Sequence, residues 1–211
     1  MIKSFTRPTL RCAVAYLIAL ALIATAGINP ATAQTNPAPQ SLPYNQAFAS
    51  LTGSTTVYPT GWQGWIIAGA LATTFPTTAP SGDQALAGGT NATTTAGVYD
   101  MNGKIGIVST GSNMRSAVLS VNTTGLTSIV VSFDAATQAQ LSAGRINELG
   151  LQYRVGTTGT FTNVVGSTYQ NNATSTINSG TASSNIQNIS VTLPAAAENA
   201  AEVQLRWVIR D

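Results

Sequence analysis

The chain has 211 residues, of which only 8% are charged, with nine Lys and Arg, seven Asp and Glu, one Cys and no His. The absence of His excludes Ser-His and Cys-His catalytic dyads, histidine zinc sites and imidazole acid–base chemistry. The formal charge of +2 would suit an anionic partner, so its meaning depends on where the basic groups lie.

The N-terminal residues have the pattern of an export signal. Basic residues precede an uncharged, largely apolar run at residues 12–28, and Ala-Thr-Ala at 31–33 is a small-x-small signal-peptidase site. We therefore expect residues 1–33 to be a helical signal peptide and Gln34 to begin a mature chain that is secreted or at the cell surface. The alternative is a membrane anchor, but the run is short for a span of about 20 residues. After cleavage no membrane span is expected.

Removal of the signal changes the charge and the cysteine count. Six basic groups then face seven acidic ones, a net charge of −1, and Cys12 leaves with the signal. A near-neutral chain lacks the basic stripe that nucleic acid requires, so no nucleic-acid partner is expected. Without cysteine the mature chain has neither disulfides nor thiol chemistry, and its hydrophobic core must hold it together.

The remaining sequence predicts an all-β domain. Residues 34–41, with two prolines, have the composition of a short extended linker, and residues 42–211 follow as one domain. Within that domain, apolar residues recur with a period of two, the pattern of half-buried strands. The apolar members of these runs are Ile105 and Ile107; Ala117, Leu119 and Val121; Ile129, Val131 and Phe133; Leu149, Leu151, Tyr153 and Val155; Ile189, Val191 and Leu193; and Val203, Leu205, Trp207 and Ile209.

Turn signals separate these runs. Asn102 and Gly103 both tolerate positive φ, which predicts a two-residue hairpin turn. Gly-Thr-Thr-Gly at 156–159 predicts a second hairpin, onto a strand through Phe161 and Val164. Apart from a single helical turn at 195–201, no helical periodicity appears.

About ten short strands, each with one apolar face, predict two stacked antiparallel sheets, a β-sandwich of jelly-roll type. A closed barrel is the alternative, and composition does not separate the two. The loops at 69–97 and 166–186 are too long for hairpins and would lie at the ends of the sandwich, where binding sites are common. The last strand stops at Asp211 without a closing turn, so we expect a module truncated at its C-terminal end.

Six stretches carry a family resemblance, and the one at 151–161 is the most specific. They are LPYNQAF at 42–48 with GW at 61–62, GVYDMNGKIG at 97–106, NTTGL at 122–126, LQYRVGTTGTF at 151–161, VTLP at 191–194 and VQLRW at 203–207. Together they resemble an N-terminal jelly-roll module of large secreted bacterial proteins. There it commonly precedes immunoglobulin-like, lamin-tail, and extracellular nuclease or phosphatase domains and a C-terminal sorting signal. The resemblance implies a non-catalytic accessory domain whose partners include downstream domains of the same polypeptide.

The acidic residues leave one common enzyme mechanism open, hydrolysis by a carboxylate pair. None of them forms a recognisable motif. Glu198 and Glu202 lie four apart on the expected helical turn, where a solvated polar turn is the simpler interpretation. Asp100, beside the Asn102-Gly103 turn, would either ligate calcium or act as a turn residue, and the lack of D-x-D-x-D spacing favours the turn. No catalytic residue, metal or cofactor is predicted.

Aromatic side chains give the strongest binding hypothesis, because flat rings stack on sugars while amides make polar contacts. The predicted ligand-binding residues are Trp65, Tyr99, Tyr169 and Tyr58. Trp62 is a further candidate, and its spacing of three from Trp65 would turn the two rings to opposite faces of a strand. Burial in the core is the alternative for each ring.

The sequence thus favours a non-catalytic β-sandwich module that binds a glycan or another cell-surface partner through its loops. The second hypothesis is a structural or adhesion spacer without a small ligand. The third is a carboxylate-dependent hydrolase.

Overall fold

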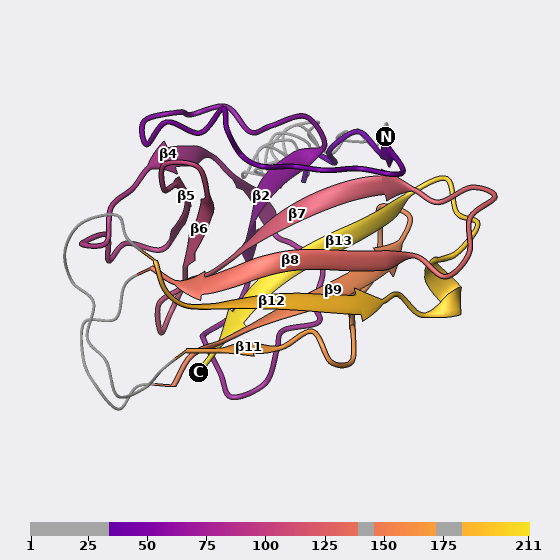
Figure 1. Ribbon diagram of the computed structural model, residues 1–211. Coiled ribbons are helices and arrows are strands. Elements are labelled where there is room, and N and C mark those ends of the chain that lie inside the picture. The colour runs from indigo at the N-terminus through magenta and orange to yellow at the C-terminus, as the bar shows by residue number, and fades with distance from the viewer. Residues whose placement is uncertain (1–33, 139–145, 172–182) are drawn as a thin grey trace, which may run out of the picture. The chain divides into compact units, whose positions relative to one another are not determined.

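The computed structural model describes residues 34–138, 146–171 and 183–211, all within one compact unit, Thr32–Asp211 (Figure 1). Regular structure in these ranges is strand, apart from one 3-10 turn, η1 (Ala195–Ala197). The strands form sheets of eight, three and two strands, and most neighbours are antiparallel. The chain is therefore all-β, as the period-two pattern predicts.

The largest sheet has the order β10-β9-β13-β7-β2-β3, with β1 added in parallel beside β7 and β11 added beside β9. Its strands are β1 (Gln40–Ser41), β2 (Trp62–Ile67), β3 (Gly82–Gln84), β7 (Met114–Asn122), β9 (Glu148–Val155), β10 (Thr162–Asn163), β11 (Tyr169–Gln170) and β13 (Val203–Arg210). The three-stranded sheet contains β4 (Leu86–Gly88), β5 (Gly97–Asp100) and β6 (Ile105–Val108), and the two-stranded sheet contains β8 (Val130–Thr137) and β12 (Ser184–Thr192). The sequence predicts two sheets, whereas the described ranges contain three. The three-stranded and two-stranded sheets are not hydrogen-bonded to each other.

Both predicted hairpins form at their turn signals. Asn102 and Gly103 have φ angles of 58° and 79°, and the Met101 N–H donates to the Lys104 carbonyl at 2.9 Å between β5 and β6. Residues 156–161, which contain the Gly-Thr-Thr-Gly signal, join β9 to β10. The helical turn expected over 195–201 is shorter and consists of η1 alone.

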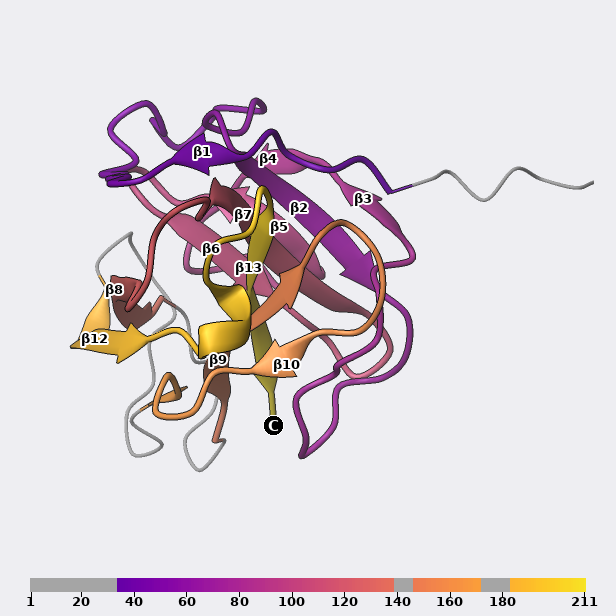
Figure 2. The same cartoon turned by 90° about the vertical axis from the view of Figure 1, so that its right-hand side faces the viewer.

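The main core lies between one face of the large sheet and the β8–β12 pair, which forms a separate layer (Figure 2). A second apolar cluster lies against the three-stranded sheet and includes Leu51, Leu86 and Val98. Trp62 of β2 packs against both clusters, and its ring stacks on Trp207 with 5.2 Å between centroids. This stack joins the two parts of the core.

The opposite face of the large sheet is buried too, which the alternating pattern does not predict. Its polar side chains Gln152, Arg154, Gln204 and Arg206 all lie in the interior. Residues 72–78, which we call the strap, contact Gln152 and Arg206, whereas Gln204 donates to Asn36 and Arg154 donates to the Gly159 carbonyl. Arg206 donates to the carbonyls of Pro76 and Thr78 in the strap, at 2.7 and 2.9 Å. Buried polar groups are stable only when hydrogen-bonded, and the strap carbonyls supply the acceptors.

Aromatic rings alternate with the arginines on this face. The Phe161 ring lies between two guanidinium groups, 4.5 Å from Arg154 and 3.8 Å from Arg206. Such cation–π contacts are strongest when the cation is desolvated. Burial, together with the like charge of Arg154, lowers the pKa of Arg206 to about 9, so Arg206 remains charged at neutral pH.

Residues 34–41, expected to form a linker, are part of the folded unit. The Thr35 N–H and hydroxyl donate to the Asp83 carboxylate at 2.9 and 2.6 Å, and the Trp65 indole N–H donates to the Thr35 carbonyl at 3.1 Å. Further along, β1 pairs with Val121 and Asn122 of β7. The segment is extended, as its prolines suggest, but it lies along the sheet.

Candidate functional site

The structure buries three of the four aromatic rings that the sequence proposed for ligand binding. Trp65 is 0% exposed, Tyr169 4% and Tyr99 8%. Trp65 packs edge-on against Phe161, the Tyr169 hydroxyl bonds to the Thr137 hydroxyl at 2.7 Å, and Tyr99 donates to the Thr95 carbonyl at 2.8 Å. A ring that stacks on a sugar needs an open face. The core interpretation therefore applies to all three side chains.

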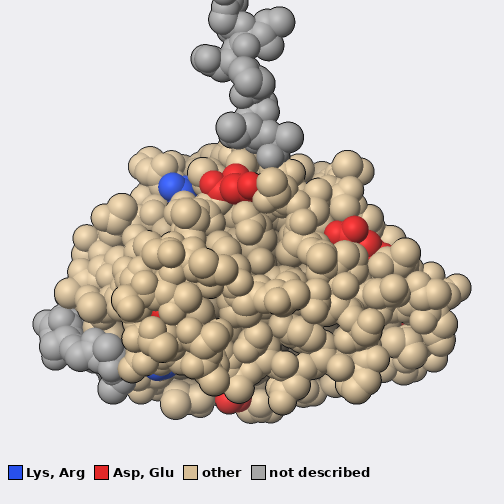
Figure 3. All heavy atoms as spheres, turned by 90° about the horizontal axis from the view of Figure 1, so that it is seen from above, with Lys and Arg blue, Asp and Glu red and all other residues tan. Residues whose placement is uncertain are grey.

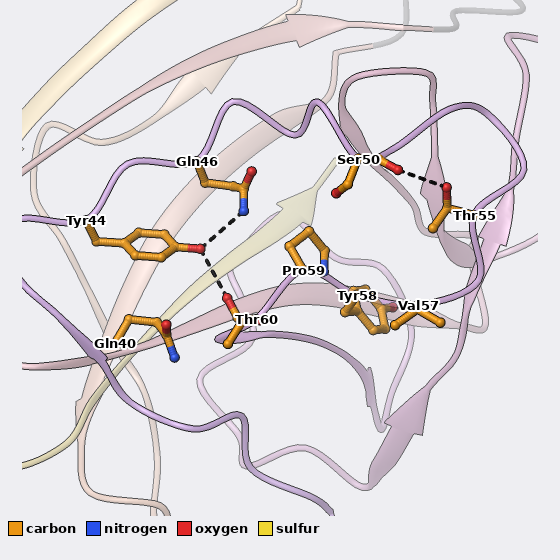
Figure 4. Close-up of a pocket in the computed structure, with 9 residues that line it drawn as sticks. All are labelled: Gln40, Tyr44, Gln46, Ser50, Thr55, Val57, Tyr58, Pro59 and Thr60. Carbon is orange, nitrogen blue, oxygen red and sulfur yellow. Dashed lines mark hydrogen bonds between the residues drawn. The ribbon is translucent and has the colours of Figure 1, made fainter.

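Tyr58, the fourth of the predicted ligand-binding residues, borders a cavity. It lines a groove of about 480 Å³, which we call the Tyr44–Tyr58 groove (Figure 4). A single stretch of chain, residues 40–60, supplies the lining side chains. These are Gln40, Tyr44, Gln46, Ser50, Thr55, Val57, Tyr58, Pro59 and Thr60, with no Asp, Glu, Lys or Arg among them.

Tyr44 is held rigidly at one end of the groove. Its hydroxyl donates to the Thr60 carbonyl at 3.1 Å and accepts from the Trp62 indole N–H at 3.0 Å and the Gln46 amide at 3.3 Å. Because Trp62 itself stacks on Trp207, the position of Tyr44 is tied to the core. In Figure 4 the Tyr44 hydroxyl points toward Gln46 and Thr60.

Tyr58 is half-buried beside Val57 and Pro59. Its hydroxyl donates to the Gln84 carbonyl at 2.8 Å, and a Cβ at Gly64 of β2 would overlap this hydroxyl. Glycine at position 64 is therefore what admits the phenol. Burial, reinforced by the Asp83 carboxylate, raises the pKa of Tyr58, so its hydroxyl stays a neutral donor.

Asp100 of β5 binds the backbone of residues 53–55, and Thr55 in this segment lines the groove. Its side chain is buried, one oxygen accepts from the N–H groups of Gly53 and Thr55 at 2.8 Å each, and the other accepts from the Asn102 N–H at 2.9 Å. Burial acts to raise the pKa of Asp100, but these backbone donors and the Thr55 hydroxyl outweigh it and hold the pKa below its ordinary value. Donors that point at both oxygens suit a turn residue, the simpler of the two sequence interpretations.

The two glutamates of the expected helical turn make separate structural contacts. Glu198 accepts from the Ser128 N–H at 2.7 Å, whereas Glu202 accepts from the Ser120 hydroxyl at 3.0 Å and the Gln204 amide at 2.9 Å. The helical turn ends at Ala197, so it does not place them side by side. Among the described residues, no three His, Cys, Asp or Glu side chains gather as a metal site would require.

Comparison with known proteins assigns no family: no family model, curated protein or solved structure matches the chain. What the structure shares with the resembled module is an all-β chain with several, mostly antiparallel sheets. Across the ranges that the structure covers, no helix has the length and hydropathy needed to cross a membrane.

Most of the residues that line the groove carry no signal in the sequence pattern. Tyr44 and Gln46 stand in the stretch at 42–48, which carried part of the resemblance but was not considered for binding. Val57, whose side chain is 72% exposed, lies outside the strands, so the period-two pattern of apolar residues does not include it. The usable signal was composition: residues 40–60 combine two tyrosines with hydroxyl and amide side chains and contain no charge.

Proposed function

We propose that the protein is a secreted, non-catalytic accessory module that binds an uncharged glycan, free or on a cell surface, in the Tyr44–Tyr58 groove. The observation that carries this proposal is the lining, which combines hydroxyls and amides with two tyrosine rings and holds no ionised side chain. Sugar hydroxyls pair with such neutral donors and acceptors, while aromatic and aliphatic groups pack against sugar C–H faces. The groove is also partly pre-formed, since Tyr44 and Tyr58 are both fixed by hydrogen bonds.

The charge distribution supports a neutral ligand. Seen from the side along which residues 40–60 run in Figure 1, the surface shows few Lys, Arg, Asp or Glu side chains (Figure 3). Several charged groups, Asp100, Arg154 and Arg206, are inside the fold. Electrostatic steering of a charged partner such as nucleic acid would need a clustered surface charge.

The finer architecture and the location belong to the same proposal. The two-layer packing of β8–β12 on the large sheet supports a sandwich of jelly-roll type. Export rests on the signal pattern of residues 1–33, and the partnership with downstream domains rests on the resemblance.

Binding to neutral glycans tests the function. We expect the exported protein to be retained by a subset of uncharged glycans on an array or by an insoluble neutral polysaccharide. Val57→Asp, which places a carboxylate in the groove, should lower that affinity by about tenfold or more, a change of about 1.4 kcal/mol. Val165→Asp is the matched control, because Val165 is 92% exposed and does not line the groove. Equal binding by wild type and Val57→Asp, with both folded, would contradict the assignment of the site.

A structural spacer is the second candidate, and the burial of Trp65, Tyr99 and Tyr169 is what favours it. Rings that stabilise the core contribute no binding surface. Uniform absence of retention across the glycan panel, by protein whose fold is verified by circular dichroism, would support the spacer and remove the binding proposal.

A further inference from the structure

Two residues at the start of the described chain complete a partly buried polar network. The Thr35 carbonyl accepts from the indole N–H of Trp65 at 3.1 Å, and the Asn36 side-chain carbonyl accepts from the Gln204 amide at 2.9 Å. Both donors belong to side chains that are fully buried. Thr35 is in turn fixed to Asp83 by its N–H and its hydroxyl. We call Thr35 and Asn36 with these partners the N-terminal clasp.

The clasp makes the fold depend on the first few residues. Removing Thr35 and Asn36 would take away the acceptor of the Trp65 indole N–H and one of the two acceptors of the Gln204 amide, and a buried donor without an acceptor is destabilising. Terminal residues are ordinarily the part of a chain that proteolysis removes first. In an exported protein, such a clasp would be protected by a terminus from which exopeptidases cannot remove residues.

Gln34 lies immediately before the clasp and immediately after the Ala-Thr-Ala site at residues 31–33. The Gln34 side-chain amide donates to Asn36 at 2.7 Å, in an exposed contact. The bonds that join Thr35 to Asp83 and Trp65, and Asn36 to Gln204, use no atom of Gln34, so the Gln34 side chain can leave Asn36 while they stay in place.

We propose that Gln34 is the mature N-terminus and that it cyclises to pyroglutamate. In this step the unprotonated α-amino nitrogen attacks the side-chain carbonyl carbon Cδ and forms a new C–N bond. The Cδ–Nε2 bond breaks, and Nε2 leaves as ammonia with a proton from the attacking nitrogen. No oxidant or other reactant is needed, and an α-amino group of ordinary pKa, about 7.7–8.0, is partly unprotonated at neutral pH.

The ring has two consequences for the molecule. It removes the positive charge of the terminus, as N-terminal acetylation does. It also leaves no free α-amine, the group that an aminopeptidase must recognise, directly in front of the clasp. The proposal rests on the export part of the proposed function and is independent of the groove.

Intact-mass spectrometry of the exported protein tests the modification. The full chain, with its own signal, is expressed in a bacterial host that secretes it, and the product is purified without proteolytic treatment. We expect the mass of residues 34–211 less one ammonia, and no reaction of the terminus with an amine-labelling reagent. A chain of residues 34–211 at its full mass, or a chain that begins at another residue, would overturn the proposal. Glycan binding by the same sample is scored separately, so failure of the groove and failure of the modification give different results.

Gln34→Ala is the matched variant, because alanine cannot form the ring. It should be exported with a free, labelled α-amine and unchanged thermal stability. Digestion with a broad aminopeptidase should leave the wild type intact and remove only the substituted first residue from the variant, stopping at Thr35 because the clasp holds that residue. Trimming of the variant through Thr35 and Asn36 as fast as through its first residue would overturn the clasp.

Discussion

Arg206→Ala is expected to lower the free energy of unfolding by about 3–5 kcal/mol, the largest effect of any single replacement proposed for this protein. The guanidinium makes two contacts to the Gln152 side-chain oxygen, at 2.9 and 2.6 Å, and donates to two strap carbonyls. It also packs on the Phe161 ring at 3.8 Å. Alanine removes all of these contacts and leaves the buried Gln152 oxygen without its donor. Urea unfolding followed by tryptophan fluorescence measures the change.

Arg206→Lys separates charge from geometry. Lysine keeps the positive charge but lacks the planar fork that reaches Gln152 and the strap together, so we expect an intermediate loss of stability. Limited proteolysis should cut residues 72–78 faster in the alanine variant than in the wild type, because the strap loses its anchor. A free energy of unfolding within about 0.5 kcal/mol of wild type, the range of ordinary surface changes, would show that Arg206 does not hold the strap.

Asp100→Asn is expected to destabilise the protein by about 2–4 kcal/mol at neutral pH. The two carboxylate oxygens accept from three backbone N–H groups, and an amide must turn its own N–H groups toward some of these donors. Thr55 borders the Tyr44–Tyr58 groove, so the same replacement should also weaken glycan binding. Asp134→Asn is the control, because Asp134 is exposed and contacts only the Asn188 amide among its described partners.

The pKa of Asp100 also determines how the stability difference between wild type and Asp100→Asn changes with pH. The pKa of Asp100 is lower in the folded protein than in the unfolded chain, where an aspartate titrates near 3.9. Its contribution to stability is therefore complete above about pH 5 and is lost as the pH falls through the folded pKa. The difference in urea midpoint between wild type and Asp100→Asn should shrink as the pH is lowered from 7 to 3. A difference that stays constant over this range would contradict the role of the ionised carboxylate.

Local sequence signals predicted the strands and the turns. A period of two places the strands at Leu149–Val155 and Val203–Ile209 because successive side chains on a strand point to opposite faces, whatever lies on those faces. The Asn102-Gly103 turn was predictable because few other residues adopt positive φ at both positions. These signals depend only on neighbours in the chain.

These local signals do not predict where several polar and aromatic side chains lie. Arg206 and Gln204 alternate with apolar residues on β13, which suggests a solvated face, yet the strap and the N-terminal clasp cover them. Trp65 and Tyr169 lie near loops in the sequence but pack inside the fold. Whether a side chain meets water depends on segments distant in the chain, and here the distances are large: Asn36 contacts Gln204, and Pro76 contacts Arg206.

By itself the sequence determined the all-β class, the positions of the main strands and both hairpin turns, and it carries the signal pattern and the lack of charge that shape the functional proposal. The tertiary structure alone decided which face of each strand is covered, that the eight-stranded sheet is buried on both sides, and that residues 40–60 enclose a groove. The physical reason is the distance along the chain over which each interaction acts. Backbone preference and side-chain alternation act between adjacent residues, whereas burial, the pKa of Asp100 and the lining of a groove arise only when distant segments pack together.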